Sequence, residues 1–189
     1  MAEAVEAGER SDIMNLLQNT LNGLKHRLTN GELTLQNSSG DAVCASFMFH
    51  PAATEEEIEN FATSYGLKIP PDYKDFLLIH NGATLFSMYG GGFLLLSLKE
   101  IKEILDRLGS AMPEGWYPVG YLDGEMLCID SKEVNVHDRK TNYLYWSLND
   151  KQKLHFNFEI WFLRFIQASG EHFWQWHYYS AENFYRLCL

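Results

Sequence analysis

A histidine beside an Asn-Gly turn is the first feature of this sequence that could do chemistry, because the arrangement is compatible with an active-site loop. The stretch is GLKIPPDYKDFLLIHNG, residues 66–82, and it contains His80. A general base needs a partner that orients it, and the sequence shows none beside His80. Pro71 suits the first position of a short helix, and Asn81-Gly82 suit the positive φ at which a helix ends. We therefore predict that His80 is a half-buried residue near helix-end carbonyls and that the segment is architectural.

Phosphate-binding and metal-binding patterns are weak elsewhere in the chain. Gly90-Gly91-Gly92 leads into an expected strand, whereas a phosphate-binding loop leads into a helix within a longer motif. His172 and His177 are five residues apart, which places them on different faces of a helix, unlike the two histidines of a zinc-binding helix. We predict no metal and no cofactor, although a metal site assembled from distant residues remains open.

Nucleophilic and acid–base catalysis also lack a recognisable arrangement. The sequence contains no Gly-x-Ser-x-Gly motif and no cysteine in a known catalytic context. Most carboxylates fall in helix first turns or at outward positions, so we expect none of them to be desolvated with a raised pKa. The sequence therefore predicts no catalytic residues and a protein that is not an enzyme. An enzyme with a dispersed site is retained as a third hypothesis.

The composition is that of an acidic globular protein. The chain has 189 residues, 46% of them hydrophobic, and its 15 Lys+Arg against 25 Asp+Glu give a net charge of −10. This length and apolar content fit one well-buried domain. A negative surface repels nucleic acid and anionic membranes, so we expect no direct binding to either and a cationic protein as the partner.

Cysteine usage and the N-terminus indicate a soluble, cytoplasmic protein. Cys44, Cys128 and Cys188 are widely spaced and odd in number, so neither a disulfide framework nor a structural zinc site is expected. Residues 1–10 lack a signal-peptide pattern and are expected to be frayed or disordered. One domain is expected over residues 11–189.

Hydrophobic periodicity predicts a chain of mixed helices and strands. A helix is expected over residues 11–28, with Ser11 as N-cap, and alternation predicts a hairpin over residues 32–49. Thr54 begins a capping box and a helix that ends at Gly66. The further elements expected are a strand after residue 92, a helix over 97–109, a hairpin over 116–130 with Asp123-Gly124 at its tip, strands at 134–138 and 143–148, a buried helix over 157–170 and an aromatic, helical segment over 171–189.

Acids beside aromatic residues are the most distinctive feature. Aromatic anchors ringed by carboxylates are typical of a surface that binds a basic protein. The first predicted set of partner-binding residues, all expected in solvent, is Glu55, Glu56, Glu59, Asp72 and Asp75. The second set, around the hairpin, is Glu114, Trp116, Tyr117, Tyr121, Asp123, Glu125 and Asp130. The alternative is that the acids only confer solubility and the aromatics fill the core.

Five segments occur in an order that matches a known family. They are the acid-rich helix and turn ATEEEIENFATSYGLKIPPDYKDFLLIHNGA, then YGGGFLLLSLKEI, WYPVGYLDGEMLCID, YLYWSL and NFEIWFLRFI. In this order they resemble the SUKH superfamily, the family of the fungal cell-wall assembly regulator and of many bacterial immunity proteins. The resemblance covers residues 49–173, and its first segment is the most specific. The family has no catalytic residues to carry over to this chain.

The resemblance implies an α+β fold: a single domain whose mostly antiparallel sheet has helices packed around it and a cleft over the sheet. For bacterial members it implies an immunity protein that binds a cognate polymorphic toxin, often a nuclease. The leading hypothesis is therefore that this protein neutralises such a toxin by occluding its basic substrate groove. The second hypothesis is a non-catalytic regulatory scaffold that binds a cellular signalling partner.

Overall fold

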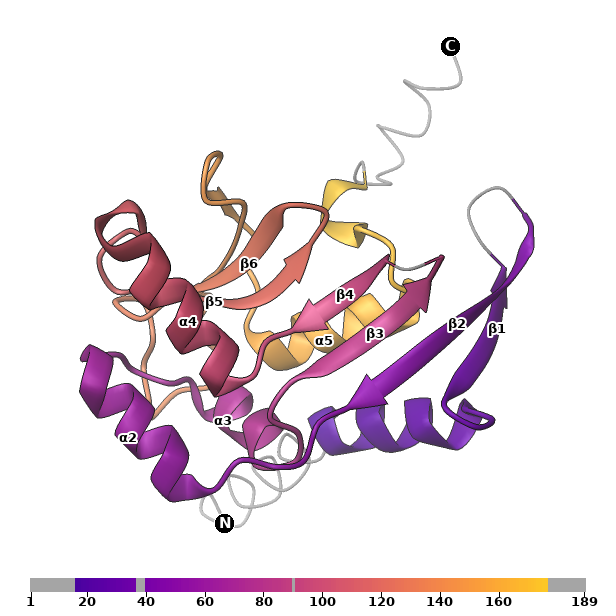
Figure 1. Cartoon of the computed structure of the whole chain (residues 1–189), viewed down its shortest axis with the longest axis horizontal. Coiled ribbons are helices and arrows are strands. Elements are labelled where there is room, and N and C mark those ends of the chain that lie inside the picture. Colours follow the sequence, from indigo (N-terminus) through magenta and orange to yellow (C-terminus); the bar gives the residue numbers. More distant parts are fainter. Residues whose placement is uncertain (1–15, 37–39, 90, 177–189) are drawn as a thin grey trace, which may run out of the picture.

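An eight-stranded antiparallel sheet dominates the computed structural model, which describes residues 16–36, 40–89 and 91–176 (Figure 1). The strands lie in the sheet in the order in which they occur in the sequence, from β1 to β8. They are β1 (Glu32–Gln36), β2 (Ala42–Phe49), β3 (Ala83–Met88), β4 (Gly91–Leu95), β5 (Trp116–Leu122), β6 (Glu125–Asp130), β7 (Leu144–Trp146) and β8 (Gln152–Lys153). With the helices, this sheet confirms the predicted α+β fold.

The helices precede the sheet, connect its strands and follow it. A first helix occupies residues 16–27. The others are α2 (Glu55–Tyr65), α3 (Pro71–Leu77), α4 (Leu98–Leu108), the 3-10 turn η1 (Gly109–Ala111), α5 (Phe158–Gln167) and the 3-10 turn η2 (Phe173–Gln175). The capping boxes predicted at the starts of α2 and α4 are both present. Among the described residues, no helix has the length and apolar content needed to cross a membrane.

Different helices cover the two faces of the sheet. On the face that we call the inner face, α5 packs behind β3 and β4 (Figure 1), and the ring of Phe93 lies 5.2 Å from Trp161 and 4.8 Å from Phe165. On the opposite, outer face, α4 covers part of β5–β7. There a small second cluster forms from Met112, Trp116 and Cys128 with Ile104, Leu105 and Leu108. The sheet is thus covered on both faces over part of β5–β7.

Two glycines of the β5–β6 hairpin have distinct structural roles. The hairpin turns at Asp123-Gly124 as predicted, with φ values of 50° and 89°, which suit a two-residue turn. Gly120 lies on the inner face, where an added Cβ would lie 2.6 Å from Cε1 of Phe93 and 3.2 Å from Cβ of Leu127. The backbone of β5 therefore approaches the aromatic core at a distance that only glycine permits.

The segment of residues 134–138, predicted as a strand, contains turns instead. Its Asn135 side chain accepts a hydrogen bond from the backbone N–H of His137 at 3.0 Å. Such local bonds offer the backbone an alternative to strand pairing. The prediction was therefore wrong because apolar alternation in a short stretch did not outweigh the turn chemistry of asparagine.

The end of α3 also differs from its prediction. The helix ends at Leu77, before Asn81-Gly82, and the Asn81 side chain instead accepts the backbone N–H of Leu98 at 2.9 Å. Asn81 thus helps to begin α4 and does not end α3. The predicted N-cap Ser11 and most of the aromatic segment at residues 171–189 lie outside the described residues.

The predicted cleft over the sheet stays a prediction. A cavity of about 290 Å³ lies between β1–β2 and the C-terminal end of α5, where Leu35, Val43 and Gln167 line it. It is at the edge of the inner face and does not correspond to a cleft across the sheet.

Candidate interaction surface and buried acidic cluster

Three predicted partner-binding residues are exposed on α2. Glu55 and Glu56 lie in its first turn, at the positive end of the helix dipole, where negative charge stabilises the helix. Glu59 Oε1 lies 3.9 Å from Nζ of Lys74, but 70% of the Glu59 side chain remains exposed. The exposure of these three acids is confirmed, and α2 presents an acidic surface to solvent.

The acids of the second set lie at two ends of one hairpin. Asp130 pairs with the first residue of β5 and Glu125 with the last, and a seven-residue strand spans about 20 Å. At the first end, Lys132 Nζ lies 2.7 Å from Glu114, and the Lys132 backbone N–H donates to Asp130 at 2.9 Å. Asp123 and Glu125 lie at the tip. The second set is therefore two separate groups, of which the first is already paired with a lysine.

Two aromatic residues of the second set are buried, contrary to the prediction that they contact a partner. Trp116 is 8% exposed and lies beneath α4, with its ring 4.4 Å from that of Tyr145. Tyr117 is 0% exposed, and its hydroxyl donates to the backbone carbonyl of Lys68 at 3.1 Å. Because β5 is covered on both faces here, neighbouring residues are both buried. Tyr121, nearer the tip, is partly exposed.

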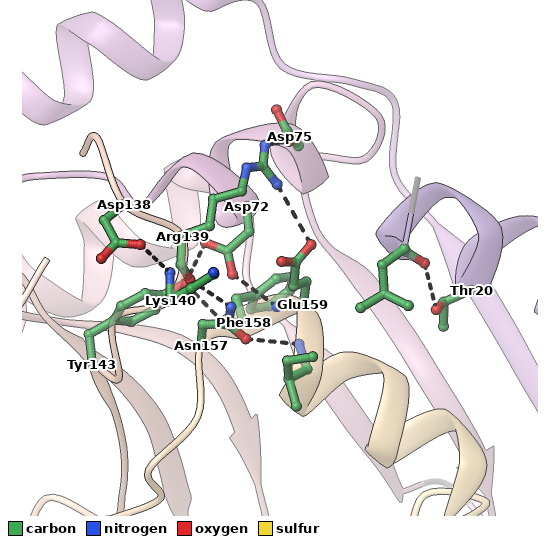
Figure 2. Close-up of polar contacts among 12 residues, drawn as sticks. Thr20, Asp72, Asp75, Asp138, Arg139, Lys140, Tyr143, Asn157, Phe158 and Glu159 are labelled. Carbon is green, nitrogen blue, oxygen red and sulfur yellow. Dashed lines mark hydrogen bonds and ion pairs between the residues drawn. The ribbon is translucent and has the colours of Figure 1, made fainter. Parts of the chain in front are cut away.

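Asp72, predicted to lie in solvent, is fully buried. Its Oδ1 accepts the hydroxyl of Tyr143 at 2.5 Å, and its Oδ2 accepts the backbone N–H of Glu159 at 3.0 Å (Figure 2). The spacing carried a signal for this position, since Asp72 precedes the inward Phe76 by one helical turn and so shares its face. Asp75, the other acid of this helix, is partly exposed and forms an ion pair with Arg139.

The N-terminus of α5 is the centre of this buried acidic cluster, which we define as Asp72, Arg139, Tyr143 and Glu159. The first three amides of a helix have no acceptor within the helix. In α5 each of these amides has an acceptor outside the helix. The Tyr143 hydroxyl accepts the N–H of Phe158 at 2.9 Å, the Asp72 carboxylate accepts that of Glu159, and the Asn157 side chain accepts that of Ile160 at 3.0 Å. The N-cap Asn157 and two side chains from elsewhere in the chain, Asp72 and Tyr143, therefore determine where α5 begins.

Glu159 is a second acid that sequence reasoning missed. It is 3% exposed, and its Oε2 has no hydrogen-bond partner among the described residues, although Nη1 of Arg139 lies 3.6 Å away. Burial, together with the charge of Asp72, raises the pKa of Glu159 to about 7, and Arg139 opposes the rise. The expectation that no acid is desolvated was therefore wrong. The signal available was a glutamate in the first turn of a mostly apolar helix.

The chemistry of the buried acidic cluster is that of an anchor. Burial raises the pKa of Asp72, and the bonds from Tyr143 and from the Glu159 amide oppose the rise because they favour the carboxylate. Asp72, Tyr143 and Glu159 are between 0% and 3% exposed, so they do not meet a substrate in this arrangement. The cluster fastens α5 to α3 and to the segment that carries Arg139. Within the described ranges, no group of three His, Cys, Asp or Glu side chains could hold a metal ion.

His80 is half-buried, as the sequence predicted, but its ring contacts a carbonyl just after a strand and not the helix-end carbonyls that were expected. Its Nδ1 lies 2.8 Å from the backbone oxygen of His50, and its Nε2 lies 2.6 Å from Nζ of Lys25. A carbonyl can only accept and an ammonium can only donate, so the imidazole is neutral, with its proton on Nδ1. Burial lowers the pKa of His80, and Lys25 adds to this effect. The histidine thus connects the helix at residues 16–27 to the end of β2.

A family model and two bacterial proteins each match more than half of this chain. The model of the SMI1/KNR4 family (SUKH-1) matches residues 52–164, a range that contains the acidic surface of α2, Asp72, the β5–β6 hairpin and Glu159. A Bacillus subtilis (strain 168) protein named "Uncharacterized protein YobM" is 38% identical over 181 residues, which cover 91% of this chain and 98% of that protein. A second protein of the same strain, named "Uncharacterized protein YnaB", is 32% identical over 140 residues, covering 69% of this chain and 88% of its own length.

Proposed function

This chain belongs to the SMI1/KNR4 family (SUKH-1), and we propose that it acts in the cytoplasm as a non-catalytic immunity protein for a bacterial polymorphic toxin. The partner would be a basic nuclease domain. The immunity protein would neutralise it by covering the positively charged groove that holds nucleic acid. No covalent step is required of the immunity protein in this mechanism.

The observation that carries the proposal is the acidic surface of α2. Glu55, Glu56 and Glu59 are exposed, and the one ion pair among them that the structure shows, from Glu59 to Lys74, spans 3.9 Å at the surface. Such a pair neutralises little charge because water screens it. The protein as a whole carries a net charge of −10. A groove built to hold phosphates is complementary to a surface of this kind.

The buried anchor also supports a binding role over a catalytic one. The acids whose pKa is raised, Asp72 and Glu159, are enclosed by α3, α5 and the chain around Arg139. The acids that face solvent are carried on regular helix and hairpin positions. A rigid scaffold with charged groups on its outside favours fast association, because long-range attraction steers the partner before contact.

The test is binding and protection. The toxin domain encoded beside this gene should form a complex with the purified chain, and cells that express this domain should survive when the chain is co-expressed. Association should slow steeply as salt rises, since the Debye length falls to about 8 Å at physiological ionic strength. A complex without protection would favour a regulatory scaffold. Absence of both binding at low salt and protection would overturn the proposal.

A further inference from the structure

A row of partly exposed residues crosses the outer face of the sheet. The strand register places Met48 of β2 opposite Thr84 of β3, Thr84 opposite Leu94 of β4, Leu94 opposite Tyr121 of β5, and Tyr121 opposite Met126 of β6. Opposite residues of an antiparallel pair point to the same face of the sheet. The five side chains therefore form one continuous row, which we name the outer-face row.

The outer-face row is accessible, and four of its five members are apolar, Thr84 being the exception. Met48 is 59% exposed, which makes it one of the large hydrophobic residues that the structure leaves in solvent, and the other four members are partly exposed. Met126 also packs against the second cluster beneath α4. The row therefore begins where α4 covers the sheet and continues outwards over four further strands.

The dimensions of the row suit the centre of a protein interface. Four spacings between neighbouring strands, each about 4.8 Å, give a length of about 19 Å. Small hydroxyl residues border it: Ser46 lies opposite Ser87, two positions before Met48 on β2. A strip of methionine, leucine and tyrosine side chains, with Thr84 and the bordering serines as small polar groups, resembles the apolar core of an interface and its polar rim.

Charge identifies the kind of partner that would cover this row. None of the residues of β1–β6 is lysine or arginine. Acids lie at both ends of the face: Glu32 lies opposite Ser46 near one end, and Asp123 lies at the hairpin tip near the other. An apolar strip between carboxylates is complementary to an apolar projection between lysines or arginines.

We propose that the outer-face row is the docking site for the basic toxin domain, and that Glu32 and Asp123 are the acids that contact it. This inference rests on the proposed function and says which surface performs it. The row supplies the apolar anchor, in which methionine and tyrosine adapt to and bury a partner's side chain. The acids of α2 then contribute long-range attraction without contact.

The decisive variant is Met48→Arg, with Val136→Arg as its matched control. Both replace an exposed apolar residue, 59% and 46% exposed respectively, by the same cation, and Val136 belongs to the segment between β6 and β7, off the row. Affinity of the full-length chain for the toxin domain should fall at least about tenfold for Met48→Arg and less than about twofold for Val136→Arg. Thermal denaturation of both variants verifies that they fold.

A second variant keeps the test independent of charge. Tyr121→Ser shortens a partly exposed ring in the centre of the row and should lower affinity by a similar factor. If the wild-type chain binds the toxin domain and both row variants bind it as tightly as Val136→Arg does, the docking site is wrong and the proposed function stands. If the wild-type chain does not bind this domain, the proposed function fails and the docking site fails with it.

Discussion

The hydroxyl oxygen of Tyr143 lies 2.5 Å from Oδ1 of Asp72, and the same hydroxyl accepts the backbone N–H of Phe158 at 2.9 Å. One buried hydroxyl therefore joins the carboxylate of α3 to the first amide of α5. Because the oxygen donates one bond and accepts another, each bond polarises the other in a medium of low dielectric. The position of α5 beneath the sheet depends on this connection.

Replacing Asp72 should destabilise the protein strongly. Asp72→Ala leaves the Tyr143 hydroxyl and the Glu159 amide buried without their acceptor, and we expect a loss of about 3 kcal/mol in the free energy of unfolding. Urea denaturation measures this loss. Asp150→Ala removes an exposed carboxylate and should change the free energy by less than about 0.5 kcal/mol. Equal effects of the two substitutions would contradict the anchoring role of Asp72.

Glu159 should make the protein less stable as the pH rises from about 5 to 8. Its pKa of about 7 in the folded protein exceeds the ordinary value of 4.5, so between these values the folded state holds more protons than the unfolded chain. The free energy of unfolding therefore falls as the pH rises through this range. Glu159→Gln should remove this slope and stabilise the protein by about 1 kcal/mol at pH 8. Chemical denaturation at several pH values is the measurement, and an unchanged slope would count against a protonated Glu159.

His80 should make the protein less stable as the pH falls, which is the opposite of the effect of Glu159. Burial lowers its pKa from the ordinary value of 6.5, so the unfolded chain binds a proton more readily than the folded protein does. The stability that neutral His80 contributes is therefore fully present above pH 6.5 and is lost as the pH falls below it. In His80→Gln this loss should shrink, even though the Lys25 contact changes. Because the Glu159 and His80 slopes oppose each other, each is determined as the difference between the wild type and its own variant.

Replacing Gly120 by alanine should destabilise the protein, whereas replacing Gly23 by alanine should stabilise it. At Gly120 the new Cβ would lie 2.6 Å from the ring of Phe93, so we expect Gly120→Ala to cost about 2 kcal/mol or more. At Gly23, within the helix at residues 16–27, a new Cβ meets no described atom within 4 Å, and Gly23→Ala should stabilise by about 0.5 kcal/mol or more. Melting temperatures of the two variants should move apart, and a shift in the same direction would contradict the packing described for β5.

Charge reversal should separate the two acidic regions. Glu55→Lys with Glu56→Lys reverses charge on α2, away from the proposed docking row, and should mainly slow association with the toxin domain and weaken its salt dependence. Asp123→Lys with Glu125→Lys reverses charge at the hairpin tip and should also speed dissociation, because contacts are lost there. Surface plasmon resonance at two salt concentrations resolves both rates. The reverse pattern would move the contact site to α2.

Much of the fold was predictable because its signals are local. The capping boxes at Thr54 and Ser97 and the hairpin turn at Asp123 each depend on residues a few positions apart, and all are present. The family resemblance then identified the α+β class. The strand at residues 134–138 failed because its apolar alternation is too short to compete with a turn.

The candidate site was predictable only in part, for a physical reason. The exposure of Glu55, Glu56 and Glu59 follows from the helical pattern of α2 alone. The spacing from Asp72 to Phe76 indicates which face of α3 Asp72 shares, but its hydrogen-bond partners Tyr143 and Glu159 lie 71 and 87 residues away, and no short-range pattern identifies them. The burial of Trp116 and Tyr117 was likewise not predicted, because two different helices cover the two faces of their strand.

The sequential order of the sheet has a consequence for how the protein is made. Each strand can pair with the previous one as it leaves the ribosome, so hairpins can form during synthesis without waiting for distant chain. The inner face of the sheet is covered by α5 only late in synthesis, because α5 follows all eight strands and its first amides need Asp72 from far upstream. A nascent chain that ends before α5 would therefore present its aromatic residues to chaperones, and the sheet would be closed off only when translation is nearly complete.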